Sequence, residues 1–291
     1  MLELTIELRF IPLIAQIIFK MNLQNKLIII TGASSGIGLA CAEECAKRGA
    51  NLVLAARQYV KICEIAAQLQ TNYTVKVLAV QTDVANEEDC KELIKQTIYT
   101  FGKIDVLINN AGISMRALFA DLDLAVLRKV MDINFWGTVY CTKYALPHLL
   151  HTNGTVVGVS SIAGFKGLPG RTGYSASKFA MNGFLESLRI ENLKTGLNVM
   201  LACPGFTASN IRNVALNSEA KSQGESSMEE DKMMTAQQVA IKIINGIESR
   251  KRELIMTGQG RLTVFMQKFF PTLLDTLVYN HFKNEKDPLI R

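Results

Sequence analysis

The chain of 291 residues lacks the patterns typical of metal sites, disulfide scaffolds and membrane spans. Its six cysteines form no Cys-x-x-Cys pair and no zinc-spaced cluster with histidine, and their usage favours a reducing compartment. The three histidines, His148, His151 and His281, have no carboxylate or cysteine partner at ligand spacing. We therefore expect no metal and a cytoplasmic location, with membrane association as an alternative.

The chain also lacks a dense cluster of charge of one sign. Charged residues make up 20% of the chain and hydrophobic residues 48%, which is ordinary for a globular protein and argues against disorder. The formal charge of +6 is spread along the chain without a dense basic block, so no nucleic-acid partner is expected. This charge is compatible with an anionic cofactor or with a membrane surface.

The N-terminal extension, residues 1–25, holds the longest apolar run, from Phe10 to Phe19. That run is shorter than the roughly 20 residues of a membrane span, and its acidic start argues against a signal peptide. Three interpretations stay open: an interfacial anchor, an extra helix packed on the domain, or a gene-model extension with Met21 as the true start. We favour the last, because the domain pattern begins cleanly at Lys26.

Residues 26–258 alternate between short apolar runs and helical patterns. This alternation predicts an α/β fold: a single doubly wound (Rossmann) parallel sheet with helices on both faces, and no internal domain boundary. Residues 209–232 are polar and predict a lid or a disordered loop. The expected strands are 26–31, 51–57, 75–84, 104–109, 155–161, 198–202 and 253–257. The first helix is expected after the glycine motif and ends at Lys47, and further helices are expected over 87–101, 124–150, 173–193 and 235–249.

A glycine motif joins the first strand to its helix. Gly32 permits a tight turn, Gly36 lets the backbone approach a pyrophosphate, and Gly38 lets helix and strand pack closely. The strand-turn-helix context makes a dinucleotide site a better interpretation than a plain glycine turn. The helix N-terminus supplies free N–H groups for phosphate.

Arg57 ends the second strand, where an NAD-binding fold usually places an acid against the ribose 2′-hydroxyl. An arginine there can pair with a 2′-phosphate instead. The sequence therefore predicts NADP(H) as the cofactor.

Tyr174 and Lys178 lie four residues apart, so on a helix they share one face. A free tyrosine has a reference pKa of about 10, and a nearby ammonium favours its phenolate form. The pair is thus a suitable proton donor and acceptor for a carbonyl/alcohol couple. Two more features support it: Ser161 ends a strand at the ligand-binding edge, and Asn134 sits unfavourably in a helix interior, which predicts an interruption there.

The C-terminal tail, residues 259–291, predicts a helical extension in which Pro271 breaks the helical pattern. Its apolar residues suit packing on the domain or on a second subunit, and a membrane-facing plateau is the second interpretation.

These motifs together resemble the short-chain dehydrogenases/reductases over residues 26–258. The matching stretches are TGASSGIG at 31–38, Asp83, NNAG at 109–112, Asn134, Ser161, YSASK at 174–178 and PG at 204–205. The tail at 258–280 is similar to that of the dehydrogenase/reductase SDR family member 7B group, which is related to the 11β-hydroxysteroid dehydrogenase type.

The resemblance implies a catalytic tetrad. Tyr174 would be the general acid or base, Lys178 would hold the ribose and lower the tyrosine pKa, and Ser161 would hydrogen-bond the substrate oxygen. Asn134 would kink its helix and hold a water that relays protons to Lys178. The implied cofactor residues are Gly32, Ser34, Ser35, Gly36, Ile37, Gly38, Arg57, Asp83, Val84, Asn110, Ala111, Gly112, Tyr174, Lys178, Pro204, Gly205 and Thr207.

We therefore expect an NADP(H)-dependent oxidoreductase that interconverts a carbonyl and a secondary alcohol on an apolar steroid-, lipid- or retinoid-like substrate. Leu168, Phe206, Met228, Met233 and the tail are the expected entrance lining. A 3-ketosphinganine-type reductase at a membrane surface and a non-catalytic nucleotide-sensing protein remain alternatives. A sugar-nucleotide epimerase is disfavoured because little chain follows residue 205. The resemblance also implies a homodimer or homotetramer formed through the helices bearing Asn134 and Tyr174.

Overall fold

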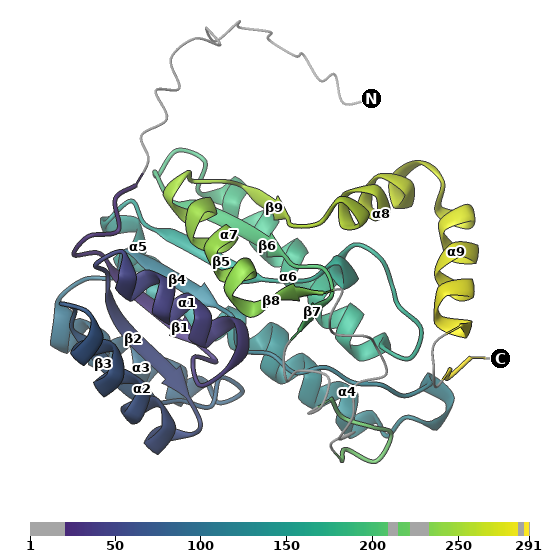
Figure 1. The fold of residues 1–291 in the computed structure, drawn as a ribbon, viewed down its shortest axis with the longest axis horizontal. Helices are drawn as coiled ribbons and strands as arrows, with labels where there is room; N and C mark the ends of the chain where they lie inside the picture. The colour runs from purple at the N-terminus through teal and green to yellow at the C-terminus, as the bar shows by residue number, and fades with distance from the viewer. Residues whose placement is uncertain (1–20, 209–214, 222–232, 285–287, 291) are drawn as a thin grey trace, which may run out of the picture.

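A computed structural model describes residues 21–208, 215–221, 233–284 and 288–290. In these residues, parallel strands form a sheet in the order β3-β2-β1-β4-β5-β6-β9, and the strand order reverses direction between β1 and β4 (Figure 1). The predicted doubly wound sheet is thereby confirmed. The strands are β1 (Leu27–Thr31), β2 (Asn51–Ala56), β3 (Val77–Gln81), β4 (Val106–Asn109), β5 (Thr155–Val159), β6 (Asn198–Cys203) and β9 (Glu253–Ile255).

Both faces of the sheet are buried, which explains why its strands are apolar throughout. Side chains alternate along β1: Ile28 and Ile30 belong to the core on one face, and Leu27 and Ile29 to the core on the other. Helices α1 (Gly36–Lys47), α2 (Tyr59–Asn72) and α7 (Ala236–Glu248) cover the first face. Helices α3 (Glu87–Phe101), α5 (Gly137–His151) and α6 (Thr172–Glu191) cover the second.

The long helix after β4 is interrupted where the sequence predicts it. Helix α4 (Leu124–Met131) runs into a π-helical turn at Asp132–Trp136, and α5 follows directly. The turn contains Asn134, which is fully buried. A residue that competes for local hydrogen bonds therefore lies where the helical ladder changes register.

Most other predicted elements are present, with ends shifted by a few residues. The helix predicted to begin at Thr235 is α7, and Thr235 forms a reciprocal capping box with Gln238. Helix α2 has no counterpart in our predictions, nor have the single 3₁₀ turns at Phe119–Asp121 and Ile162–Gly164 or the two-residue strands β7 (Thr207–Ala208) and β8 (Met234–Thr235).

The chain reaches the sheet through residues 21–25, which pack on the domain. Leu23 is fully buried, and the Met21 amide donates to the Glu248 carbonyl at the end of α7. Of the polar stretch 209–232, residues 209–214 and 222–232 lie outside the described residues. Between them, Leu216 forms a parallel bridge with Met115.

Two helices, α8 (Gly258–Phe269) and α9 (Pro271–Lys283), follow the last strand and form an arm beside the carboxyl edge of the sheet (Figure 1). The predicted break at Pro271 is confirmed, since Pro271 begins α9. Only a few of the arm's apolar side chains are buried, among them Leu274 and Phe282. No helix among the described residues is long and apolar enough to cross a membrane.

Candidate active site

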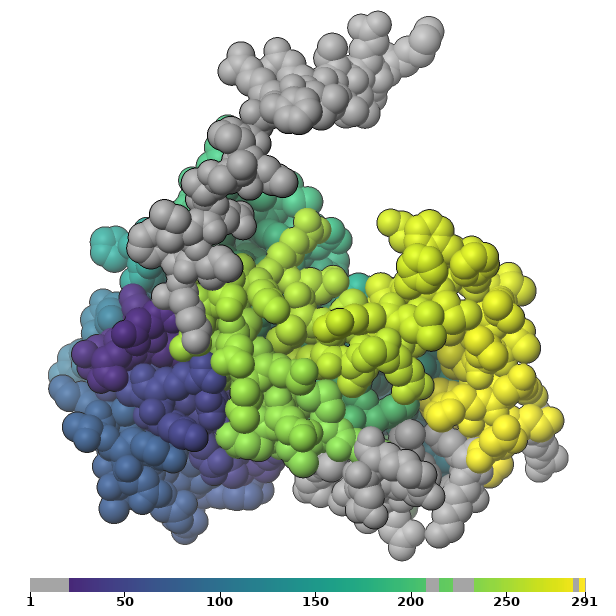
Figure 2. Space-filling model, turned by 45° about the horizontal axis from the view of Figure 1, so that its top comes forward, coloured from purple at the N-terminus to yellow at the C-terminus, as the bar shows by residue number. Residues whose placement is uncertain are grey.

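A cleft of about 1930 Å³ opens at the carboxyl ends of the strands. Its lining includes the loops after β1, β2, β3, β4, β5 and β6 and residues of both helices of the arm. Figure 2 shows a hollow between the yellow arm and the green part of the body. The cleft lies where the strand order reverses, which is the usual place for ligands in an open α/β sheet.

A glycine cradle forms the floor of the cleft beneath the N-terminus of α1. Gly32 and Gly36 have positive φ angles of 66° and 56°, a conformation that favours glycine. A Cβ atom at Gly38 would lie 2.9 Å from the Gly32 carbonyl carbon, so this helix and turn pack too closely for any side chain. Gly38 therefore supports the cradle from below and does not line the cleft.

The start of α1 fits a phosphate. Ser35 is the N-cap residue, yet within the described chain its side chain makes no capping hydrogen bond to the first turn. The N–H groups of that turn thus point toward the cleft without a side-chain acceptor, and the helix dipole favours an anion there. These residues fit the pyrophosphate of a dinucleotide.

Strands β1 and β4 are joined at the reversal point by hydrogen bonds. The Thr31 hydroxyl accepts from the backbone amides of Asn110 and Ala111, each at 3.0 Å. The Asn110 side-chain amide donates to the Thr31 carbonyl at 2.9 Å. These contacts hold the Asn110-Ala111-Gly112 loop against the glycine turn.

Positive charge gathers after β2, at one end of the cleft. Arg57 lines the cleft with an exposed side chain, and Lys61, in the first turn of α2, lines it too. Sequence reasoning missed Lys61 because the helix that carries it was not predicted. The apolar residues Ile62, Ile65, Ala66 and Leu69 recur at helical spacing, and this pattern is the signal that would have predicted the helix.

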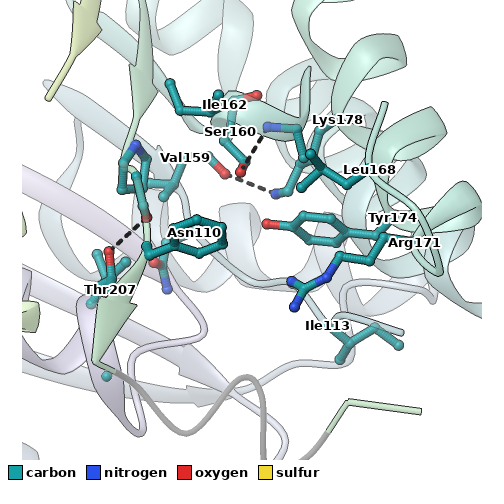
Figure 3. Close-up of a pocket in the computed structure, with 18 of the residues that line it drawn as sticks. Asn110, Ile113, Val159, Ser160, Ile162, Leu168, Arg171, Tyr174, Lys178 and Thr207 are labelled. Atoms are coloured by element: carbon teal, nitrogen blue, oxygen red, sulfur yellow. Dashed lines mark hydrogen bonds between the residues drawn. The ribbon is translucent and has the colours of Figure 1, made fainter. Parts of the chain in front are cut away.

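Tyr174 and Lys178 lie on the first turns of α6 and face the cleft (Figure 3). The Lys178 ammonium is 5.8 Å from the centre of the Tyr174 ring and donates to the Val159 carbonyl at 2.9 Å. Burial of this lysine lowers its pKa from 10.5 to about 8. Arg171 lies beside the Tyr174 ring in the same view.

Ser161 follows β5 and caps the 3₁₀ turn Ile162–Gly164. Its hydroxyl oxygen accepts from the Ala163 amide at 3.1 Å. Since a hydroxyl carries one proton besides its lone pairs, this contact leaves the proton to donate to a substrate oxygen. Ser161 and Tyr174 both line the cleft.

Asn134 lies behind the cleft rather than in its lining. Its side-chain oxygen accepts from the Ile113 amide at 2.8 Å, and its amide nitrogen donates to the Ile113 carbonyl and the Ser177 hydroxyl, each at 2.9 Å. Ser177 in turn donates to the Tyr174 carbonyl at 2.7 Å. Asn134 therefore ties the loop after β4 to the helix that carries Tyr174.

The arm lines one side of the cleft and is held to the body by polar and aromatic contacts. Asp275 of α9 forms an ion pair with Lys166, a buried lysine after the Ser161 turn. His281 stacks on Phe206 with ring centres 6.4 Å apart. The roof is mainly apolar, with Leu262, Met266, Leu274, Leu277, Val278 and Phe282 in its lining.

The structure brings nearly all predicted site residues to one cleft. Every predicted cofactor residue except Gly38 lines it, and so do Ser161, Tyr174 and Lys178. Of the predicted entrance residues, Leu168, Phe206 and Met233 line it, whereas Met228 lies outside the described residues. Among the polar lining residues that our predictions missed are Gln58, Lys61, Thr82, Ser160, Lys166, Arg171 and Thr257.

A parallel doubly wound sheet, a glycine-cradled helix start and a tyrosine–lysine pair at the reversal point together define a nucleotide-binding oxidoreductase of the Rossmann class. The family model described as short chain dehydrogenase matches residues 26–220. The chain belongs to this family, as its sequence motifs predict.

The curated relatives support the same group. The 11-beta-hydroxysteroid dehydrogenase A of Sesamum indicum is 37% identical over 242 residues, which cover 83% of this chain and 68% of that protein. The 11-beta-hydroxysteroid dehydrogenase 1A of Arabidopsis thaliana is 34% identical over 277 residues, or 92% and 78% of the two chains. The predicted resemblance to the 11β-hydroxysteroid dehydrogenase-like group is confirmed.

Solved structures confirm the fold. A short chain dehydrogenase/reductase of Burkholderia phymatum in complex with NAD superposes with a TM-score of 0.78 at 24% identity and covers 87% of this chain and 96% of its own. An alcohol dehydrogenase of Thermococcus sibiricus complexed with 5-hydroxy-NADP gives a TM-score of 0.70 at 24% identity, with 80% and 96% covered.

Proposed function

We propose that the protein is an NADP(H)-dependent reductase or dehydrogenase that interconverts a carbonyl and a secondary alcohol on an apolar substrate. The observation that carries this proposal is the meeting of Ser161, Tyr174 and Lys178 at one cleft beside the glycine cradle. A protein that only senses a nucleotide needs the cradle but has no need of this polar group at the substrate end.

In the proposed mechanism, Tyr174 moves the proton. Its hydroxyl protonates the substrate oxygen in reduction and accepts the proton in oxidation. Ser161 donates a hydrogen bond to the same oxygen and stabilises the charge that develops on it. Lys178 holds its ammonium near the Tyr174 ring, which favours the phenolate.

The cofactor would lie along the cleft, with its pyrophosphate at the start of α1 and its ribose near Tyr174 and Lys178. The nicotinamide supplies or accepts the hydride when bound, and the protein aligns it with the substrate. Arg57 and Lys61 support NADP(H), because both cations line the cleft just after β2 and would pair with a 2′-phosphate. Asn134 would hold the relay water beside Lys178 as well as brace the site.

The apolar roof of the cleft supports an apolar substrate. The relatives' name denotes a hydroxysteroid substrate, and Leu168 and the arm would give a molecule of that kind an apolar lining. The exposed apolar side chains on the outside of the arm, such as Phe265 and Phe269, keep the 3-ketosphinganine-type alternative open. Stimulation of turnover by lipid vesicles would favour that alternative.

We further propose a homodimer or homotetramer in the cytoplasm. Trp136 and Phe179 are 43% and 45% exposed on the helices that bear Asn134 and Tyr174, which suits burial against another subunit. All six cysteines are unpaired thiols, which fits a reducing compartment.

The proposal is tested by NADPH consumption with carbonyls graded from small polar ketones to long-chain and steroidal ones, with NADH as the second cofactor. Turnover should rise with substrate hydrophobicity and fall by at least about 100-fold in Tyr174→Phe, which removes only the acid. If the mutant retains wild-type turnover, the mechanism is wrong. If NADPH stabilises the protein but no carbonyl is reduced, the sensor alternative gains support.

A further inference from the structure

A polar clamp on α6 lies next to the proposed catalytic residues and has no role in the mechanism above. Asn182 follows Tyr174 and Lys178 at the same four-residue spacing, so the three side chains share one face of α6. The Asn182 amide nitrogen donates to the Gly164 carbonyl at 2.9 Å. Its amide oxygen accepts from the Ser160 hydroxyl at 2.5 Å.

These two partners bracket Ser161. Ser160 precedes it directly, and Gly164 ends the 3₁₀ turn that Ser161 caps. Lys178 adds a third contact on the strand side, since it donates to the Val159 carbonyl. The segment from Val159 to Gly164 is therefore fastened to α6 on both sides of Ser161.

The space around the clamp is tight. Ser160 is only 3% exposed, and a Cβ atom at Gly164 would lie 2.7 Å from the Asn182 amide nitrogen and 2.9 Å from the Ser160 hydroxyl oxygen. Glycine at 164 thus allows the close approach that the two hydrogen bonds need. The amide nitrogen and the amide oxygen each make a hydrogen bond, which fixes the orientation of the group as well as its position.

We propose that Asn182 is a positioning residue that sets the distance between the Ser161 hydroxyl and the Tyr174–Lys178 pair. This inference rests on the proposed function, since it assigns Ser161 and Tyr174 to one substrate oxygen. Both donors must reach that oxygen at hydrogen-bond length, and a displacement of about 1 Å can cost about 100-fold in rate. Asn182 acts through Ser161 and touches neither substrate nor cofactor.

The test combines Asn182→Ala, Ser160→Ala and the double variant, with Thr97→Val as control. Thr97 makes a buried hydrogen bond to the Leu93 carbonyl inside α3, away from the cleft, so its loss reports stability alone. The single clamp variants should lower kcat by about 10- to 100-fold with the KM for NADPH within about twofold. The kcat of the double variant should be no lower than that of the less active single variant, because both changes open the same clamp.

Amide hydrogen exchange gives a second readout that needs no turnover. The amides of Ala163, Gly164 and Phe165 are hydrogen-bonded within the Ser161 turn, so they should exchange faster in Asn182→Ala and remain unchanged in Thr97→Val. A kcat within twofold of wild type in Asn182→Ala overturns the inference. A wild-type protein without carbonyl turnover counts against the proposed function, and unchanged exchange in Asn182→Ala then overturns the clamp as well.

Discussion

Replacing Lys178 with methionine should make the protein more stable while removing its activity. The burial that lowers the Lys178 pKa from 10.5 to about 8 is a penalty on the charged form in the folded state. Since one pKa unit is worth about 1.4 kcal/mol, the penalty at neutral pH is about 3 kcal/mol. Loss of the hydrogen bond to the Val159 carbonyl offsets about 1 kcal/mol of this.

The expected net gain for Lys178→Met without cofactor at pH 7 is thus about 2 kcal/mol, or about 5 °C in Tm. The gain depends on pH in a defined direction. Between pH 8 and 10.5 the unfolded chain binds more protons than the folded protein, so wild-type stability rises with pH in that window. The advantage of the methionine variant should therefore shrink as pH approaches 10.5.

Thermal unfolding at pH 7, 8, 9 and 10 measures this directly. Lys95→Met is the matched control, because Lys95 is 78% exposed and its ion pair with Glu92 at 3.4 Å is a surface contact of little energy. A Lys178→Met protein that is less stable than wild type at pH 7, or whose advantage does not change up to pH 10, would refute the reasoning.

Three further changes separate the parts of the cleft. Arg57→Asp should lower the preference for NADPH over NADH by about 10- to 100-fold, the value of about one or two charge-assisted hydrogen bonds, and unchanged selectivity in steady-state kinetics would contradict its role. Gly38→Ala should abolish the rise in Tm on adding NADPH, whereas Gly183→Ala, which adds a Cβ in open space on α6, should leave that rise intact. Asp275→Ala breaks the ion pair with Lys166, so it should speed proteolysis within the arm and lower the unfolding free energy by about 1 kcal/mol, and by less at high salt. Equal cleavage rates in the variant and the wild type would show that this ion pair does not hold the arm to the body.

The part of the site that lies close in sequence was predictable because local rules govern it. Rules that act within a few residues predict the glycine turn and place Tyr174 and Lys178 on one helix face. Asn134 conflicts with such a rule, because asparagine is unfavourable in a helix interior. Lys61 escaped because the helix that carries it was not predicted. Asn182 escaped because its partners Ser160 and Gly164 lie 22 and 18 positions away in the chain. The contact between Lys166 and Asp275 spans 109 positions in the chain, and no short-range pattern encodes it.

The arm was predictable as helices, but the way in which it packs was not. Apolar content and Pro271 predict two helices, but the sequence alone leaves open whether they pack on the domain or face outward. The structure shows both: Leu274 and Phe282 are buried, while Phe265 and Leu273 are each 55% exposed. An amphipathic pattern indicates which residues share a face and leaves its partner unspecified.

The π-helical turn at Asp132–Trp136 has a consequence for how this sequence can vary. Such a turn holds one residue more than regular α-helical geometry needs, so removal of a single residue there would restore a continuous helix. The restored helix would rotate α4 relative to α5 by about 100°, although α4 packs on α6 and α5 packs on α3. Insertions and deletions should therefore be selected against within the five central residues of this helix.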